Sequence, residues 1–424
     1  MAISARVSIL VMLAAACNFP RPPDLADAPV APGDAATGCQ HDVDCSGGTP
    51  VCIDNACAVC RTSATCPTSS PVCDEASHHC RLCAKDSECD SGACDLAVGS
   101  CIAQAAILYV SPQGDPASPC TLMSPCSFTR VADVVDDDHP YIVLSAGIYI
   151  FDSARFDGKS TTIVGGGATI ADSGGATTVV VANGSSIEMR DLIVEDYLDQ
   201  DDSDHSAIIL VQNSTVTVDN MKGRSSHRDA LNASIQSTIT IRHSTFSGRT
   251  VYANGYLAVD DSYFLTGGPY VHGSAQITNS IIVSGAGQSA LDISSHDPAH
   301  SSKFANNTFI GGDIKCDTED TLRVFTNNIL LGQSAIASAG TGCQYNYNLV
   351  QDRIDSGALF GVGNTTGDPL FVDAAHGDFH LMPGSPAIDA GEPASPLSSR
   401  DADGKTRPQG TRSDIGAFEY VPAP

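Results

Sequence analysis

The chain has 424 residues, a formal net charge of −27 and no tryptophan. This acidity disfavours nucleic acid as a partner, because neutralising phosphates needs clustered lysine and arginine. It disfavours adsorption to anionic lipid for the same reason. Glycine is frequent, with 38 residues, and charged residues make up only 17% of the chain. Such a composition favours many short strands and turns over amphipathic helices.

The first 16 residues are predicted to be a signal peptide, because Arg6 precedes an apolar run that is too short to span a bilayer. Residues 13–17 (LAAAC) resemble the lipobox of bacterial lipoproteins, which implies that Cys17 is lipidated and becomes the new N-terminus. An ordinary cleavage site near Ala16 is the alternative. Residues 17–38 are proline-rich and indicate an extended tether. We therefore expect an exported lipoprotein of the outer membrane or cell surface, with a lipid bilayer as partner.

Twelve of the 17 cysteines fall within residues 39–101 as three sets of four. The sets begin 21 and 23 residues apart, which indicates a repeated unit. Units this short cannot bury a sufficient core, so we expect two disulfides in each, with three pairings open per unit. The sets are Cys39, Cys45, Cys52 and Cys57; Cys60, Cys66, Cys73 and Cys80; and Cys83, Cys89, Cys94 and Cys101.

A zinc site is the alternative for part of this region. Cys57 with Cys60, and Cys80 with Cys83, have a spacing close to that of zinc ribbons. Each pair falls at a junction between units, however, and export favours oxidation over thiolate ligation. We therefore expect disulfides and no metal here.

Five cysteines lie outside the repeated units. Cys120 and Cys126 are close enough in sequence to pair, and Cys316 is expected to pair with Cys343 across adjacent coils. Cys17 is then left over, which suits a lipidated residue.

Residues 107–350 carry a second repeat, in which an apolar residue is followed two places later by Asn, Asp or His. The polar position recurs about every 23 residues, a period typical of stacked solenoid coils. Strands that alternate apolar and polar residues bury one face, and stacking extends that core from coil to coil. We therefore predict an all-β parallel solenoid rather than a β-sandwich. The polar positions are Asp191, Asn220, His243, Asp261, Asn279, Asn306 and Asn327.

Two details follow from this interpretation. Asparagines stacked in successive coils are expected to hydrogen-bond along a ladder, so Asn306 and Asn327 are predicted to be ladder members. A solenoid end also exposes apolar strand edges and needs a cap. Residues 128–135 place apolar side chains at helical spacing, which predicts a short amphipathic helix over the N-terminal end.

Residues 108–114 and 142–149 resemble the opening of bacterial right-handed parallel β-helix proteins, which are related in fold to pectate lyases. Residues 368–372, 384–391 and 414–420 are similar to the closing segment of such exported proteins, often called a choice-of-anchor segment. The resemblance implies right-handed coiling and a C-terminal cap over residues 351–424. It implies no particular reaction, because one fold hosts many functions.

Two departures from minimal coil length lie in successive coils. The first inserts acidic residues and a histidine, and the second carries bases. Because neighbouring coils stack, we expect these excursions to lie side by side as a ligand-binding surface, bordered by Tyr252, Tyr256, Tyr263 and Tyr270. The predicted site residues are Asp199, Asp201, Asp202, Asp204, His205, Arg224, His227, Arg228 and Asp229.

Carboxylates beside bases suit a polysaccharide lyase, in which calcium or another cation neutralises a uronate and a base abstracts the α-proton. A pair of solvated loops joined by salt bridges is the alternative. No catalytic motif of a pectate lyase or chondroitinase is found, so no catalytic residue is assigned. The favoured hypothesis is a non-catalytic surface lipoprotein whose rigid solenoid binds carbohydrate or another ligand, or acts as a spacer. The alternative is a β-helix lyase or glycoside hydrolase.

Overall fold

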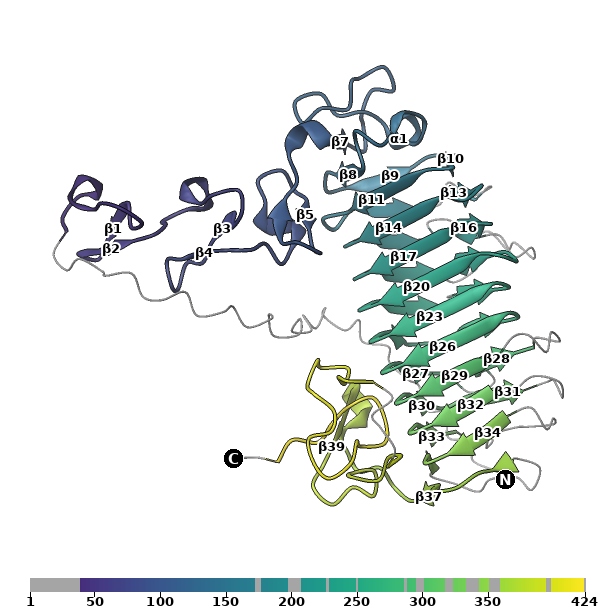
Figure 1. Ribbon diagram of the computed structural model, residues 1–424. Helices are drawn as coiled ribbons and strands as arrows, with labels where there is room; N and C mark the ends of the chain where they lie inside the picture. Colours follow the sequence, from purple (N-terminus) through teal and green to yellow (C-terminus); the bar gives the residue numbers. More distant parts are fainter. Residues whose placement is uncertain are drawn as a thin grey trace, which may run out of the picture.

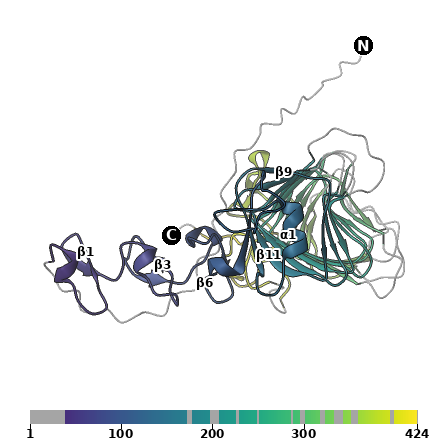
Figure 2. The same cartoon turned by 90° about the horizontal axis from the view of Figure 1, so that it is seen from above.

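The chain forms an all-β, right-handed parallel β-helix preceded by a small disulfide-rich region, which confirms the predicted fold class. In the computed structural model (Figure 1), three long parallel sheets follow one another around the coil, with eight, 12 and 11 strands among the described residues. Seen along the solenoid axis, the strands of successive coils lie over one another (Figure 2). The structure describes residues 39–171, 177–196, 207–225, 229–248, 251–285, 288–294, 301–316, 323–332, 343–350, 359–393 and 398–422.

From β8 to β31, each coil runs through the twelve-strand sheet, then the eleven-strand sheet, then the eight-strand sheet; the later coils have described strands in the first two sheets. The twelve-strand sheet contains β7 (Ile107–Val110), β8 (Tyr141–Leu144), β11 (Ser160–Val164), β14 (Ser186–Arg190), β17 (Thr215–Asp219), β20 (Thr238–Arg242), β23 (Tyr256–Asp260), β26 (Ser274–Thr278), β29 (Ser302–Ala305), β32 (Arg323–Thr326), β34 (Cys343–Asn346) and β36 (Leu359–Phe360).

The eleven-strand sheet contains β9 (Ile148–Ile150), β12 (Thr169–Ala171), β15 (Ile193–Glu195), β18 (Lys222–Ser225), β21 (Thr245–Gly248), β24 (Tyr263–Phe264), β27 (Ile281–Val283), β30 (Thr308–Ile310), β33 (Ile329–Leu331), β35 (Leu349–Val350) and β37 (Thr365–Thr366). The eight-strand sheet contains β10 (Ala154–Asp157), β13 (Val179–Ala182), β16 (Ala207–Gln212), β19 (Asp229–Ala233), β22 (Val251–Ala253), β25 (Tyr270–Val271), β28 (Ser289–Ile293) and β31 (Asp313–Cys316).

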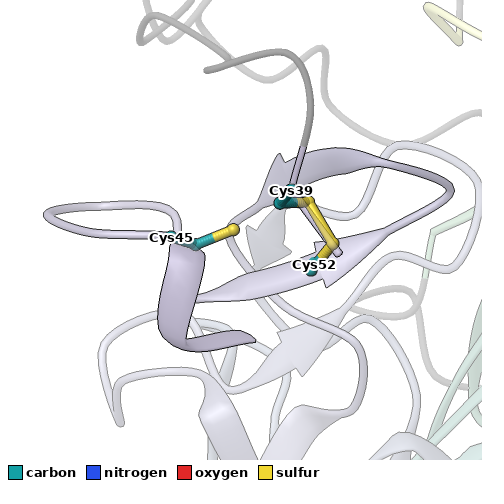
Figure 3. Close-up of side chains that lie close together, drawn as sticks. All are labelled: Cys39, Cys45 and Cys52. Atoms are coloured by element: carbon teal, nitrogen blue, oxygen red, sulfur yellow. A yellow bond between two sulfur atoms is a disulfide. The ribbon is translucent and has the colours of Figure 1, made fainter. Parts of the chain in front are cut away.

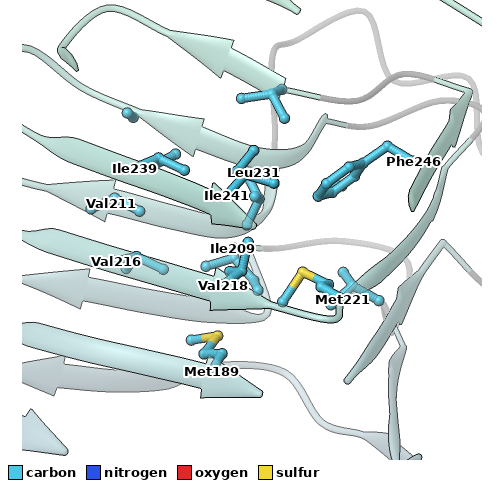
Figure 4. Packing of buried hydrophobic residues seen from close by; sticks show 14 of the residues in the cluster. Met189, Ile209, Val211, Val216, Val218, Met221, Leu231, Ile239, Ile241 and Phe246 are labelled. Atoms are coloured by element: carbon cyan, nitrogen blue, oxygen red, sulfur yellow. The ribbon is translucent and has the colours of Figure 1, made fainter. Parts of the chain in front are cut away.

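The core is one continuous apolar column inside the coils. Val216, Ile239 and Leu257 are register partners in successive strands, and all are fully buried. Figure 4 shows Ile209 and Leu231 of the eight-strand sheet lying close to this column. Because one face of every strand is buried, a slip of one residue would expose a whole apolar face, so the burial fixes the register.

In the coils from β14 to β35, a two-residue turn joins the twelve-strand sheet to the eleven-strand sheet. Its first residue adopts a left-handed backbone at all seven predicted positions, with φ from 46° to 58°. Asn and Asp tolerate this conformation better than other non-glycine residues. The predicted phase of the repeat is therefore confirmed by the backbone.

The ladder itself uses the second residue of each turn, which corrects the expectation for Asn306 and Asn327. Asn307 Nδ2 donates to Asn328 Oδ1 at 3.0 Å, and Asn328 Nδ2 donates to Asn348 Oδ1 at 3.0 Å. Asn327 Oδ1 instead accepts from Glu392 N of the C-terminal segment at 2.8 Å. The second residue of the turn points toward the core and forms the asparagine ladder, whereas contacts between first residues, such as Asn220 Nδ2 donating to Asp191 Oδ1, lie outside the core.

The N-terminal end of the solenoid is covered by the predicted helix, α1 (Phe128–Val134). The Ser127 hydroxyl accepts from Arg130 N and caps it, which satisfies one of the free amide groups of the first turn. Phe128 and Val131 are buried in the solenoid core, and the Phe128 ring stacks on Phe151 at 4.8 Å.

The three cysteine-rich units share one disulfide pattern, first to third and second to fourth cysteine. Each contains a 3₁₀ turn, η1 (Asp42–Asp44), η2 (Ser63–Thr65) or η3 (Asp86–Glu88), and a hairpin, β1 (Val51–Ile53) with β2 (Ala56–Ala58), β3 (Val72–Cys73) with β4 (Cys80–Arg81), or β5 (Cys94–Asp95) with β6 (Ser100–Cys101). Figure 3 shows the first bond, Cys39–Cys52, beside Cys45. The pairs are Cys39–Cys52, Cys45–Cys57, Cys60–Cys73, Cys66–Cys80, Cys83–Cys94 and Cys89–Cys101.

These bonds occupy the sulfurs of both zinc-ribbon-like pairs, so the zinc alternative does not apply. Cys120 and Cys126 are also joined, as expected. Cys343 is disulfide-bonded, whereas the side chain of Cys316 and all of Cys17 lie outside the described part. Disulfides in this number indicate an exported protein. Among the described residues, no helix has the length and apolarity to span a membrane.

The third unit docks on the outer face of the twelve-strand sheet. Ala93 packs with Tyr109 and Val164, and a further 3₁₀ turn, η4 (Gln104–Ala106), leads into β7. Arg190 Nη1 lies 3.4 Å from Asp86 Oδ1 and donates to Cys94 O at 3.0 Å. The first two units project away from the solenoid (Figures 1 and 2).

The C-terminal segment packs on the outer face of the eleven-strand sheet. It begins with β38 (Phe371–Asp373), η5 (Ala374–His376) and β39 (Asp378–Leu381) and continues as turns. Phe379 and Phe418 pack on Ile281, while Leu381 and Ile415 pack around Ile329. The segment therefore covers the later coils of that sheet, as Figure 1 shows.

Candidate functional site

The three outer faces of the solenoid differ in what covers them. The third cysteine-rich unit lies on the early strands of the twelve-strand sheet, and the C-terminal segment lies on the late strands of the eleven-strand sheet. Within the ranges that the structure describes, no apolar cluster places a segment over the outer face of the eight-strand sheet. Side chains gathered on this face are therefore the first candidates for a ligand site.

A line of side chains, here called the tyrosine column, crosses this face from β19 to β31. Tyr252 and Tyr270 are register partners in adjacent coils. Their neighbours are polar or charged. The column consists of Asn232, Tyr252, Tyr270, Asp292 and Lys315, each the partner of the next.

A second line, the polar column, lies two residues further along the same coils. His272 is its best-connected member: its ring lies 4.9 Å from the Tyr252 ring, and Nδ1 is 2.9 Å from Ser294 Oγ. The backbone N–H groups of this column donate hydrogen bonds to carbonyl oxygens of the preceding coil, so its residues stack from coil to coil. The polar column consists of Ser234, Asn254, His272 and Ser294.

The ends of the tyrosine column are tied by polar contacts. Asn232 Nδ2 donates to Asp229 Oδ2 at 3.3 Å. Lys315 Nζ lies 3.7 Å from Asp292 Oδ2. Tyr270 is 43% exposed, so a large part of its ring is open to a ligand. The arrangement offers aromatic surface flanked by hydrogen-bonding groups.

The predicted site is only partly described. Arg224 is exposed on β18 of the eleven-strand sheet, and Asp229 begins β19 of the eight-strand sheet and is only 3% exposed. These two residues therefore lie on different sheets. Seven of the predicted residues lie outside the described part: Asp199, Asp201, Asp202, Asp204, His205, His227 and Arg228.

The structure corrects the expected border of four tyrosines. Tyr252 and Tyr270 do share a face, but Tyr256 lies on the twelve-strand sheet. Tyr263 packs beneath the C-terminal segment. The sequence does contain the information that places Tyr252 and Tyr270 on the same sheet. They are 18 residues apart, which is the length of each coil between His243 and Asn279. His272, Asp292 and Lys315 were missed because nothing in their local sequence marks them as outward residues of one sheet.

Among the described residues, the groups close enough to share a metal ion consist of cysteines, and those sulfurs are in disulfides. The calcium expectation for the acidic insertion falls outside the described part and stays a prediction.

A cluster of titratable groups lies where the solenoid meets the C-terminal segment. His243 Nδ1 is 2.8 Å from Asp219, and its Nε2 is 3.6 Å from Asp261. Burial raises the pKa of Asp261 to about 7, and the nearby Asp401 and Asp403 carboxylates add to this. The hydrogen bond to Asp219 raises the pKa of His243 above its ordinary value. These groups are part of a joint between two segments, not of the exposed tyrosine face.

Within the C-terminal segment, His380 bridges Asp403 at 2.8 Å and Asp378 at 2.6 Å. Its ring stacks on Phe418 at 4.1 Å. The hydrogen bond to Asp403 raises the pKa of His380, and the same bond holds the pKa of Asp403 down to about 2. Burial raises the pKa of Asp414 to about 6.

No protein-family model matches the sequence, and no curated protein matches it. Among solved structures, the chain is similar to pectate lyase Pel9A at 14% identity, covering 75% of this chain and 100% of that one with a TM-score of 0.49. It is similar to pectate lyase C from Erwinia chrysanthemi at 10% identity, covering 56% and 80% with a TM-score of 0.36. A mutant of the alginate lyase AlyGC matches at 12% identity, covering 75% and 59% with a TM-score of 0.29. These scores assign no substrate or activity to this chain.

Proposed function

We propose that the chain is an exported glycan-binding module whose binding surface is the outer face of the eight-strand sheet between β19 and β31. The observation that carries this proposal is the register pairing of Tyr252 with Tyr270 in adjacent coils. Aromatic side chains offer a large contact area with a polar tip, and they lose little conformational entropy on binding.

The scaffold suits such a role. Tyr252 and Tyr270 lie on strands rather than loops, with fully buried residues on either side of Tyr252. Sites built on rigid elements hold their side chains more accurately than sites on loops. The first two cysteine-rich units project away from the solenoid, so they would serve as a spacer toward the cell envelope.

A glycan array tests the proposal. The purified chain should bind a defined class of glycans, and the double substitution Tyr252→Ala with Tyr270→Ala should abolish that binding. Tyr256→Ala is the matched control, because Tyr256 is similarly exposed but lies on the twelve-strand sheet. Equal binding by the double variant, with circular dichroism unchanged, would place the binding surface elsewhere.

We propose membrane attachment through a lipidated Cys17, on the basis of the LAAAC segment at 13–17. Mass spectrometry of the mature N-terminus tests this directly. The expected result is a chain that begins at Cys17 and carries acyl chains; an unmodified N-terminus at another residue would refute it.

A carbohydrate-active enzyme is the second candidate, because His272 and Lys315 place a proton acceptor and a cation on the same face as the tyrosines. A positioned base and a cation that stabilises developing charge are what proton abstraction beside a carboxylate needs. Turnover of uronate polymers would appear as an increase in ultraviolet absorbance from unsaturated products. Turnover that disappears in His272→Gln would make this candidate the better account.

A further inference from the structure

We infer that the turn closed by the Cys120–Cys126 disulfide inserts its tip, Leu122 and Met123, into the surface of a bilayer whose lipids carry no net charge. This inference concerns a different part of the molecule from the glycan face, and it rests on the proposed membrane attachment through Cys17. Three features carry it: the exposure of the tip, the rigidity of the turn and the lack of charge around it.

The tip places two large apolar side chains in water. Met123 is 92% exposed, and no large apolar side chain in the described part of the chain is more exposed; the adjacent Leu122 is 47% exposed. Single exposed apolar side chains are common on protein surfaces, but turns usually carry small or polar residues. Neither residue has a left-handed backbone, so the turn itself does not select them. Their exposure indicates a contact with something outside the chain.

The turn is held in place at both ends. Cys120 and Cys126 are joined by the disulfide, and both are buried. Cys126 N donates to Tyr109 O at 3.0 Å, and Tyr109 N donates to Cys120 O at 2.8 Å, so the turn is tied to β7. Nearer the tip, Thr121 and Ser124 exchange two backbone hydrogen bonds of 3.1 and 3.0 Å. A turn that is already rigid loses little conformational entropy when its tip is bound.

The surroundings of the tip in the sequence are uncharged. Residues 116–129 contain no charged side chain, although the whole chain carries a formal charge of −27. No charge therefore has to leave water when the tip enters an apolar medium, which would be costly. Val43 shows the contrast: it is 89% exposed but lies between Asp42 and Asp44. Inserting Val43 would bury two carboxylates, so exposure alone does not make a membrane contact.

A bilayer fits this tip better than a partner protein does. Stable protein interfaces bury about 800 Å² on each side and use about 20–30 residues of each partner. The tip offers two side chains at the end of one turn, which is too little for such an interface. A weak insertion is sufficient at a membrane, because the proposed anchor at Cys17 would make the second contact intramolecular and raise its effective concentration.

The tip lies at the end of the solenoid that carries the cysteine-rich units. Tyr109 of β7 binds the turn through its backbone, and its hydroxyl donates to Ser91 O of the third unit at 3.0 Å. The first two units project to the side of the solenoid rather than along its axis (Figure 1). They therefore do not hold this end away from a membrane. The proposed glycan face runs along the side of the solenoid, so it would stay accessible with the tip inserted.

Tryptophan fluorescence tests the insertion, because the chain contains no tryptophan. Met123→Trp places the one indole at the tip. Ile235→Trp is the matched control, because Ile235 is 73% exposed between β19 and β20 in the middle of the solenoid. The full exported chain is reconstituted with phosphatidylcholine vesicles whose acyl chains are either brominated or not. Brominated chains should quench the emission of Met123→Trp at least about threefold, as expected for a side chain at the boundary between headgroups and acyl chains. They should leave Ile235→Trp unchanged.

The lipid composition separates insertion from attraction by charge. Replacing part of the phosphatidylcholine by phosphatidylglycerol should not strengthen the quenching of Met123→Trp, because the tip carries no cation. Quenching that requires phosphatidylglycerol, quenching that is equal in Ile235→Trp, or no quenching at all would overturn the inference. Mass spectrometry of the same preparation shows separately whether Cys17 carries acyl chains. A failure of insertion is therefore distinguishable from a failure of the proposed membrane attachment.

Discussion

The outer faces of the eleven-strand and eight-strand sheets start from the same architecture and end with opposite surfaces. Both sheets bury one side in the same apolar column. On the eleven-strand sheet, the outward residues of the later coils include Ile281, Ile329 and Leu349, and the C-terminal segment covers them. On the eight-strand sheet, the outward residues of comparable coils include Tyr252, Tyr270 and Asp292.

This difference shows how a solenoid separates stability from function. The inward residues are constrained by stacking, since each coil must continue the core of its neighbour. The outward residues are not constrained in this way. On the eleven-strand sheet they bind the C-terminal segment of the same chain, and on the eight-strand sheet they form the proposed ligand surface. If the two faces are independent, a substitution on one leaves the other unaltered.

The largest effect is expected from the buried ion pair that holds the C-terminal segment together. Arg407 and Glu419 are both completely buried, with Nη1 to Oε1 at 2.7 Å. Arg407→Ala leaves a buried carboxylate uncompensated, which costs about 3–5 kcal/mol. Proteolysis of the C-terminal segment should become much faster, while glycan binding should persist. Arg155→Ala, in an exposed pair on the first coil, is the control, and equal proteolysis of both variants would contradict the prediction.

The second largest effect is expected from the asparagine ladder inside the solenoid. Asn328→Ala removes hydrogen bonds to Asn348 Oδ1, Phe304 O and Asn307. Losing buried amide partners should lower the free energy of unfolding by about 1–3 kcal/mol. Asn183→Gly is the control, because Asn183 is exposed at a turn with φ of 57° that glycine adopts readily. A variant Asn328→Ala as stable as wild type in urea unfolding would show that the ladder contributes nothing.

A reciprocal pair of tyrosine substitutions separates the two faces. Tyr270→Ala should weaken glycan binding about tenfold, in line with about 0.5–1.5 kcal/mol for an aromatic contact beyond its area. Tyr263→Ala should loosen the C-terminal segment, against which Tyr263 packs, and leave glycan binding unchanged. Titration calorimetry and thermal unfolding of both variants provide the comparison. A loss of binding in Tyr263→Ala equal to that in Tyr270→Ala would mean that the faces are coupled.

The smallest effect is a pH dependence confined to the joint under the C-terminal segment. The folded pKa values of Asp261, about 7, and Asp414, about 6, lie above the ordinary value of 3.8. The folded state therefore binds more protons than the unfolded state in this range, and stability falls as pH rises from about 4 to about 7. The raised pKa values of His243 and His380 act in the same direction above pH 6.5. The lowered pKa of Asp403, about 2, has the opposite effect only below about pH 4.

Thermal unfolding between pH 4 and pH 8 measures this effect. The melting temperature of the C-terminal segment should decrease across the interval, and Asp261→Asn should make the decrease smaller. A melting temperature that increases with pH would contradict the assigned directions.

The sequence was sufficient to predict the solenoid, because its period and phase are local properties. The turn positions from Asp191 to Asn327 are all confirmed by their left-handed backbone. The ladder was misplaced by one residue, because the sequence does not show which residue of a two-residue turn points inward. The separation of Tyr256 and Tyr263 from Tyr252 was also missed. Which sheet carries a residue depends on its place within the coil, and which sheet is covered depends on tertiary packing.

The central claim, that the outer face of the eight-strand sheet contacts a glycan, can be tested with a single fluorophore. The chain contains no tryptophan, so Tyr270→Trp introduces a unique emission signal in the middle of the tyrosine column. Titration with a glycan that binds the wild-type chain should shift and strengthen this emission to saturation, because a sugar ring on the indole removes water from it. Tyr256→Trp on the twelve-strand sheet should not respond. A glycan that still binds Tyr270→Trp but leaves its emission unchanged, or that changes the emission of Tyr256→Trp instead, would contradict the account.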